Sequence, residues 1–178
     1  MPGKAESRGD ETAQTVLIVD DNEMFRGSID KLFRSVGLQT ALYASAGELL
    51  DAALPDTACC ILVDVRMPKM SGLDLQEALA ARRVRAPVIV MTGHADVPMT
   101  VRAMKAGAVD FLAKPFRDQD MIDAVTAALA KDGKRRALAR DVAEVKARHD
   151  ALTPREQQVM TLVTAGLLNK QVAGVLGL

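Results

Sequence analysis

The stretch that decides the fold is Cys59-Cys60-Ile61-Leu62-Val63-Asp64-Val65-Arg66-Met67-Pro68. A run of apolar residues leads straight into one aspartate, and a turn that contains a proline follows. An uninterrupted apolar run of this length is typical of a parallel strand that is covered on both faces. Open α/β sheets place their chemistry at the carboxyl ends of their strands. We therefore expect Asp64 to lie at the rim of a sheet, with its carboxylate in the crevice there.

The segments on either side carry the same kind of pattern. Short apolar runs that predict further strands cover residues 16–19, 40–44, 88–91 and 109–112. Segments of helical periodicity alternate with the strands, and the residues that would cap or start these helices are Asn22, Ser45, Ser71, Asp96 and Asp118. Five strands that alternate with five helices predict an α/β fold, a doubly wound parallel sheet with helices on both faces.

Polar residues stand at the ends of four predicted strands, and the sheet would bring them to one edge. In chain order they are Asp20, Asp21, Asp64, Thr92 and Lys114. Three carboxylates in one place would raise one another's pKa unless a cation neutralised them, and Mg²⁺ prefers such oxygen ligands. Together with a lysine and a hydroxyl, they predict a phosphoryl-transfer site in which a carboxylate forms an acyl phosphate.

Composition narrows the class of protein. The 178 residues include 23 basic and 23 acidic ones, which argues against a globally basic nucleic-acid binder. No apolar run is long enough to span a membrane, and the polar N-terminus lacks the apolar core of a signal peptide. Cys59 and Cys60 are adjacent on one strand, so their side chains point to opposite faces and a disulfide between them is not expected. We therefore expect a cytoplasmic protein that contacts no membrane.

Changes in composition divide the chain into four segments. We expect a disordered lead-in at residues 1–14, an α/β domain at 15–130, a helical linker at 131–151 and a helical segment at 152–178. Gly133 is interpreted as a hinge or weak turn near the start of the linker. Spacings of four, three, four and three residues then separate Leu138, Val142, Val145, His149 and Leu152. A heptad seam this short fits either a solvated helix that joins two domains or a coiled coil that pairs two protomers.

The last segment predicts two helices. Thr153 and Glu156 form a capping box at the start of the first helix. The apolar stripe that this helix would bury consists of Val159, Leu162 and Val163. Asn169 would cap a second helix over residues 170–176, and Gly177 would end it.

Four motifs stand out in the predicted α/β domain: VLIVDDNE (16–23), DVRMPKMSGLDL (64–75), VIVMTGHADVPM (88–99) and GAVDFLAKPF (107–116). They resemble the receiver domain of two-component response regulators, most closely the FixJ-type branch. The resemblance covers about residues 15–130 and implies a five-stranded, flavodoxin-like receiver fold. In the last segment, LTPREQQVM (152–160) and LNKQVAGVLGL (168–178) resemble the start of the LuxR-type helix-turn-helix domain that FixJ-type regulators carry.

The resemblance implies a role for each strand-end acid. Asp64 would be the phosphoacceptor, and Asp20 and Asp21 would form the acidic pocket beside it. Asp21, Asp64 and the main-chain carbonyl of Arg66 would bind Mg²⁺ directly. Arg66 and His94 would flank the phosphoryl group, where they either shield it from water and tune its lifetime or are simply exposed loop side chains.

The resemblance also implies how the protein switches. Thr92 would move to bond the phosphoryl group, and Phe111 would be the aromatic residue coupled to it. Lys114 would pair with the phosphoryl oxygens, and the peptide bond between Lys114 and Pro115 is expected to be cis.

The implied function is a signalling switch rather than an enzyme. A histidine kinase would donate a phosphoryl group to Asp64, and the chain would catalyse only its own phosphorylation and dephosphorylation. The phosphorylated protein would dimerise through its fourth helix and fifth strand, and in full length it would bind promoter DNA and regulate transcription. The last segment resembles only the first two helices of a four-helix domain, so we expect a chain cut inside that domain and unable to bind a specific operator.

Two other functions fit part of the pattern. A phosphatase of the haloacid-dehalogenase type also uses a strand-end aspartate with Mg²⁺, but it needs a second acid two residues later. This chain has Arg66 two residues after Asp64 and Asn22 two residues after Asp20, which counts against the phosphatase. A phosphate-independent scaffold that works through the helix at 131–152 is the other alternative, and failure of Asp64 to react with acetyl phosphate would favour it.

Overall fold

The computed structural model describes residues 13–177. The strands are β1 (Gln14–Val19), β2 (Gln39–Tyr43), β3 (Ala58–Asp64), β4 (Val88–Thr92) and β5 (Asp110–Ala113). The helices are α1 (Glu23–Ser35), α2 (Ala46–Asp51), α3 (Gly72–Ala81), α4 (Val97–Lys105), α5 (Asp118–Asp150), α6 (Pro154–Thr164) and α7 (Asn169–Leu176). Of the lead-in predicted at 1–14, residues 1–12 lie outside the described part of the chain, and Gln14 already belongs to β1. No helix within the described residues is long and apolar enough to cross a membrane.

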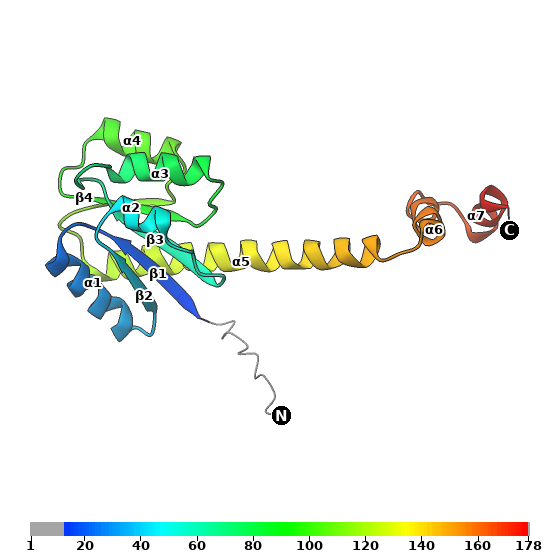
Figure 1. Ribbon diagram of the computed structural model, residues 1–178, viewed down its shortest axis with the longest axis horizontal. Coiled ribbons are helices and arrows are strands. Elements are labelled where there is room, and N and C mark those ends of the chain that lie inside the picture. Colours follow the sequence, from blue (N-terminus) through cyan, green and yellow to red (C-terminus); the bar gives the residue numbers. More distant parts are fainter. Residues whose placement is uncertain (1–12, 178) are drawn as a thin grey trace, which may run out of the picture. The chain divides into compact units, whose positions relative to one another are not determined.

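The five strands form one parallel sheet in the order β2-β1-β3-β4-β5 (Figure 1). The chain runs from β1 to one edge and then returns to β3 and proceeds to the other edge. The order therefore reverses between β1 and β3, which is the position where open α/β sheets bind their ligands. β1 and β3, the two strands at this position, are buried along the apolar runs 16–19 and 59–63. The predicted fold class is confirmed.

Helices cover both faces of the sheet (Figure 1), with α1 and α5 packed on one face and α2, α3 and α4 on the other. Alternate residues of β3 serve the two faces: Cys59, Ile61 and Val63 join the core under α2–α4, and Cys60 and Leu62 join the core under α1 and α5. Cys59 and Cys60 do not form a disulfide with each other, as predicted. Burial raises the pKa of the Cys60 thiol far above its ordinary value, so this thiol stays protonated.

The helices of the sheet begin where the capping residues predict. Each predicted N-cap accepts a hydrogen bond from the backbone N–H three residues on: Asn22, Ser45, Ser71 and Asp96. Helix α2 ends at Asp51, four residues before Pro55. Leu54 precedes Pro55, and the ring of a proline disfavours the helical conformation in the residue before it. This restriction excludes Leu54 from the helix, which already ends at the extended backbone of its C-cap residue, Ala52.

Helix α5 continues without a break through Gly133, so the hinge or turn predicted there is wrong. The adjacent side chain gives the reason. Asp132 is fully buried, and its Oδ2 accepts a hydrogen bond of 3.1 Å from the backbone N–H of Cys59. Its Oδ1 lies 2.5 Å from Nη2 of Arg135 on the next turn. These contacts fix this part of the helix, and the first of two compact units ends at Arg135.

The second compact unit begins at Arg136 and contains α6 and α7. The predicted capping box of Thr153 and Glu156 starts α6, as expected. In α7, however, Asn169 is the first helical residue and not the cap. Leu168 occupies the cap position, and its backbone N–H is satisfied by Oε1 of Gln171 at 2.9 Å.

The apolar stripe predicted on α6 is not buried. None of the residues of α6 is buried, and Val163 is 48% exposed. In α7 the only buried residue is Val172. A pair of helices this short offers each stripe too little opposing surface to remove it from water.

Candidate functional site

Three charged side chains meet at the carboxyl edge of the sheet. Register pairs Val19 of β1 with Val63 of β3, so the next residues of each strand, Asp20 and Asp64, lie side by side. Lys114 follows β5, and its Nζ lies 2.7 Å from Oδ1 of Asp64 and 3.0 Å from Oδ2 of Asp20. The strand-end convergence that the sequence predicts is therefore present for these three residues.

The second oxygen of each carboxylate is held by the backbone. The N–H of Asn22 donates to Oδ1 of Asp20 at 2.8 Å, and the N–H of Arg66 donates to Oδ2 of Asp64 at 2.7 Å. Burial raises the pKa of Asp20, although the Asn22 N–H and the Lys114 ammonium both act to lower it. The two acids are thus fixed in orientation, one oxygen toward the lysine and one toward the chain.

Lys114 is positioned by its backbone and by two aromatic rings. Its N–H donates to the carbonyl of Thr92 at 2.7 Å, and its peptide bond to Pro115 is cis, as expected. Its Nζ lies 3.8 Å from the centre of the Phe25 ring, and Phe25 meets Phe116 edge to face with ring centres 6.3 Å apart. A cation above a ring face is attracted by the ring's quadrupole, so Phe25 helps to hold the ammonium at the edge. Phe25 was not among the site residues predicted from the sequence.

Thr92 and Phe111 lie on the same face of the sheet. Thr92 is fully buried at the end of β4, and its Oγ1 accepts a hydrogen bond of 3.2 Å from the N–H of His94. Because side chains alternate along a strand, Thr92 shares the face of Val90, whose register partner is Phe111. The half-buried Phe111 packs on the core beneath α2–α4. The two predicted switch residues therefore share one face of the sheet on neighbouring strands.

Three predicted residues stand apart from this cluster. Asp21, Arg66 and His94 are all exposed. Within residues 13–177, no three His, Cys, Asp or Glu side chains are gathered closely enough to hold a metal ion. The structure thus brings together Asp20 and Asp64 but does not add Asp21 to form the three-carboxylate group that the sequence suggests.

The donor set still fits a hard divalent cation. Asp20 and Asp64 carry two negative charges against the single positive charge of Lys114, and the exposed Asp21 adds a third negative charge next to them in sequence. Only oxygen donors are available from these acids, which is the ligand type that Mg²⁺ requires. The excess negative charge at this edge is what such a cation would balance.

A glycine allows the close turn behind Asp64. A Cβ on Gly72 would lie 2.3 Å from the main-chain oxygen of Asp64, far inside any normal contact. The N–H of Gly72 donates to the carbonyl of Val65 at 3.0 Å, so the start of α3 is tied to the turn after β3. This role of Gly72 was not predicted, because its only signal in the sequence is a glycine directly after an N-cap serine.

Comparison with known proteins agrees with this architecture. Residues 16–126 match the response regulator receiver domain, and residues 150–178 match the luxR family of bacterial regulatory proteins. The chain is 50% identical to nodulation protein W of Bradyrhizobium diazoefficiens, over 100% of this chain and 81% of that protein. It is 44% identical to the transcriptional regulatory protein FixJ of Azorhizobium caulinodans, over 92% of this chain and 77% of that one.

A solved structure shares both the fold and the order of its parts. The low-resolution structure of the response regulator StyR aligns with a TM-score of 0.86 and 42% identity, over 93% of this chain and 84% of that one. The crystal structure of FixJ-N aligns with 66% of this chain at 44% identity and a TM-score of 0.61. The chain therefore belongs to the response regulators of two-component systems, with a receiver domain followed by a LuxR-type DNA-binding segment.

Proposed function

We propose that Asp64 accepts a phosphoryl group from a histidine kinase and that this modification switches the protein on. The observation that carries the proposal is the pairing of Asp64 with Lys114 at 2.7 Å, at the carboxyl end of the sheet, where the strand order reverses between β1 and β3. A carboxylate oxygen of Asp64 would attack the phosphorus, and the bond from phosphorus to the kinase histidine would break. The electron pair of that bond would stay on the imidazole nitrogen.

The residues around Asp64 have separate tasks in this transfer. Lys114 would exchange one of its two carboxylate contacts for a phosphoryl oxygen and neutralise part of its charge. Asp20, Asp21, Asp64 and the main-chain carbonyl of Arg66 would hold Mg²⁺ at this edge. When bound, the cation would supply further positive charge to balance the phosphoryl oxygens. The hydrogen bonds from the Asn22 and Arg66 N–H groups keep the carboxylates oriented, so little reorganisation is needed during the reaction.

Thr92 and Phe111 would convert the modification into a change of surface. The Thr92 hydroxyl accepts from the His94 N–H, and it remains able to donate its own proton to a phosphoryl oxygen. Its movement toward Asp64 would leave space on the α4 face, into which the half-buried Phe111 would turn. Because the phosphoryl group adds charge and acceptors, it favours the arrangement in which Thr92 and Lys114 both contact it.

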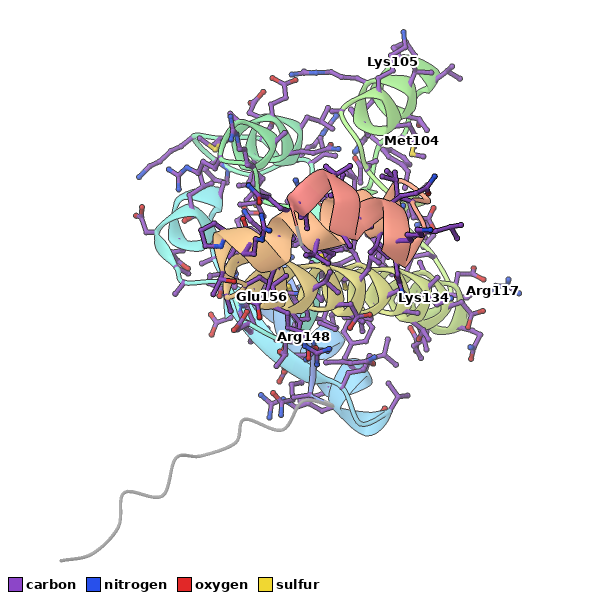
Figure 2. The ribbon with its side chains drawn as sticks, turned by 90° about the vertical axis from the view of Figure 1, so that its right-hand side faces the viewer. Met104, Lys105, Arg117, Lys134, Arg148 and Glu156 are labelled. Carbon is purple, nitrogen blue, oxygen red and sulfur yellow. The ribbon has the colours of Figure 1, made fainter. Side chains whose placement is uncertain are left out.

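The surface that changes would be the one that pairs two protomers. Helix α4 exposes Val97 at 76%, Val101 at 44% and Met104 at 47%. Met104 and Lys105 mark the end of this helix in Figure 2. An apolar face of this kind suits a partner surface, and we propose a homodimer that forms on phosphorylation. A complete LuxR-type domain would then act on promoter DNA in the cytoplasm, and the protein would catalyse no reaction beyond gain and loss of its own phosphoryl group.

Arg66 and His94 are proposed to set the lifetime of the phosphoryl group. Both side chains are exposed, and their backbone N–H groups bond Asp64 and Thr92 respectively. From these positions the side chains would screen the reacting atoms from water. We expect faster dephosphorylation of Arg66→Asn and His94→Ala, measured by loss of label over time. Rates equal to that of the unaltered chain would show that these side chains are only exposed loop residues.

The proposal is tested by reaction with acetyl phosphate and Mg²⁺. Intact-mass measurement should show one added phosphoryl group on the unaltered chain and none on Asp64→Asn. Asp123→Asn is a matched control, because Asp123 is an exposed residue of α5 whose recorded contact is with Gln119. Sedimentation analysis of the same samples should show that phosphorylation increases the dimer fraction of the unaltered chain and leaves that of Asp64→Asn unchanged. Absence of label on the unaltered chain would refute the proposal and favour the phosphate-independent scaffold.

A further inference from the structure

The second part of α5 exposes an apolar seam. Leu138, Val142 and Val145 are 65%, 59% and 66% exposed, and all lie in the second compact unit. Their spacing of four and then three residues places them on one stripe of the helix. His149 continues this stripe, but Leu152 lies beyond the end of α5 at Asp150, so the seam has four positions and not the five that the sequence suggested.

The surroundings of the seam are charged. Residues 139–148 are exposed along the whole stretch. An apolar stripe in such a helix leaves several large side chains in water, which a facing helix with the same stripe would cover. Heptad positions follow from the spacing: Leu138 and Val145 occupy d positions, and Val142 and His149 occupy a positions.

We propose that a second copy of this chain packs along this seam, parallel and in register, and that it does so without phosphorylation. The occupant is a second copy because the flanking charges complement one another in that arrangement. Asp141 occupies a g position and Lys146 the e position of the following heptad, and these two positions face each other across a parallel pair. Each copy would thus contribute one Asp141 and one Lys146 to two symmetric ion pairs.

The helix itself supplies Asp141 with no cation at the usual distance. The residues three and four positions away are Ala137, Leu138, Glu144 and Val145. An antiparallel pair would instead set g against g and place Asp141 near Arg148 of the second copy. Arg148 is already engaged, since its Nη2 lies 2.5 Å from Oε1 of Glu144 on its own helix (Figure 2 marks Arg148 on α5). The charges therefore favour the parallel arrangement.

The C-terminal end of the seam is hydrogen-bonded to α6. Nε2 of Gln157 donates to the carbonyl of His149 at 3.2 Å and to that of Leu152 at 3.4 Å. A parallel pair would consequently bring the two copies of α6 to corresponding positions on either side of the seam. Two heptads give weak association, so this contact would add to the pairing that we propose for the phosphorylated receiver and would not replace it.

Disulfide cross-linking tests the pairing directly. Cys59 and Cys60 are completely buried, so a cysteine introduced on α5 would be the accessible thiol among the described residues. Val145→Cys at the seam is compared with Ala147→Cys at the outward f position, both in chains that also carry Asp64→Asn and receive no phosphodonor. We expect Val145→Cys to form disulfide-linked dimers at least about tenfold faster, because a paired helix raises the local concentration of the thiol. Equal rates would overturn the proposal.

Charge exchange tests the register. Asp141→Lys and Lys146→Asp should each weaken self-association about threefold at low ionic strength, measured by sedimentation equilibrium, because each leaves like charges facing across the pair. The double variant restores opposite charges and should return to the association of the unaltered chain. All three changes lie on exposed residues, so folding is not at risk. If the double variant loses as much self-association as the two single changes combined, the parallel register is overturned. This conclusion does not depend on the result of the phosphorylation test.

Discussion

Two aspartates lie buried at opposite ends of β3, and their surroundings differ. Asp64 ends the strand at its carboxyl edge, and Lys114 lies 2.7 Å away. Asp132 of α5 lies against the other end, where it bonds the backbone of Cys59 and pairs with Arg135 at 2.5 Å. Each acid is therefore buried and paired with a cation.

The cations come from different places. Arg135 stands three residues from Asp132 on the same helix, and the Asp132 side chain is 0% exposed. The Lys114 side chain is 24% exposed, that of Asp64 is 9% exposed, and the two residues are fifty positions apart in sequence. A local, closed pair acts as a clip that fastens α5 to β3. The pair of Asp64 and Lys114 is open to solvent, so a third group can enter between the two side chains. Solvent access, and a cation that comes from a distant part of the chain, therefore distinguish the proposed reactive acid from the structural one.

The largest expected difference between the two acids is in the rate of phosphorylation after each is replaced by asparagine. Asp64→Asn should reduce the rate of reaction with acetyl phosphate and Mg²⁺ at least about 100-fold, because the carboxylate nucleophile is lost. Asp132→Asn should retain the rate within about twofold, since Asp132 lies at the opposite end of the strand. Phosphate incorporation followed over time checks both. Comparable loss in both variants would show that the clip contributes to the reaction.

The order reverses for stability. Asp132→Ala should lower the free energy of unfolding by about 3 kcal/mol, because it leaves a buried backbone N–H and a partly buried guanidinium without this partner. Asp64→Ala should leave stability unchanged or raise it, since it removes one of two carboxylates that share a single ammonium. Urea denaturation of the two variants beside the unaltered chain gives both values. Equal losses would remove the distinction drawn here between clip and reactive site.

The turn behind Asp64 is expected to tolerate no side chain. Gly72→Ala places a Cβ 2.3 Å from the Asp64 carbonyl oxygen, so the backbone must shift, at a cost of about 2 kcal/mol. The shift should also slow phosphorylation, because it displaces Asp64, the proposed phosphoacceptor. Gly47→Ala is the matched control, since its nearest neighbour would be Oγ of Ser45 at 3.8 Å. Its stability should be unchanged or slightly higher, as expected for alanine in a helix.

The sequence predicted the reactive end of β3 better than the structural end. Asp20, Asp64 and Lys114 could be placed together because each follows an apolar strand, and parallel strands bring such ends to one edge. That inference needs only the order and direction of the strands. It does not depend on how any helix is rotated or tilted.

The remaining contacts depend on such details. The pairing of Asp132 with Cys59 joins residues 73 positions apart, and Asp132 stands in a charged run that resembles a solvated helix. The contact of Phe25 with Lys114 requires the rotation of α1 about its axis, which helical periodicity gives only to within a face. The Gly72 contact depends on how closely one turn follows a strand. None of these carries a local signal that separates it from ordinary packing.

A third aspartate, Asp30 of α1, is only half-buried, and its removal is expected to have the smallest effect of the three. Oδ1 of Asp30 accepts hydrogen bonds from the Thr40 hydroxyl and from Nε of Arg34, the latter at 2.7 Å. The hydrogen bond from Thr40 is the main cause that holds the pKa of Asp30 below its usual value, followed by that from Arg34. A carboxyl whose pKa is lower in the folded state stabilises the fold above the unfolded pKa of about 3.9 and loses this contribution as pH falls through the folded pKa.

Asp30→Asn should therefore lower the free energy of unfolding by about 0.5 kcal/mol at pH 6, and this difference should shrink toward pH 3. The effect is far smaller than that of Asp132→Ala because solvent screens the ion pair with Arg34, whose side chain is 64% exposed. Urea denaturation of both chains at the two pH values measures it. A difference that stays constant with pH would mean that the carboxyl charge of Asp30 is not what binds Thr40 and Arg34. Burial of the charged carboxylate would then not explain how much each of the three aspartates contributes to stability.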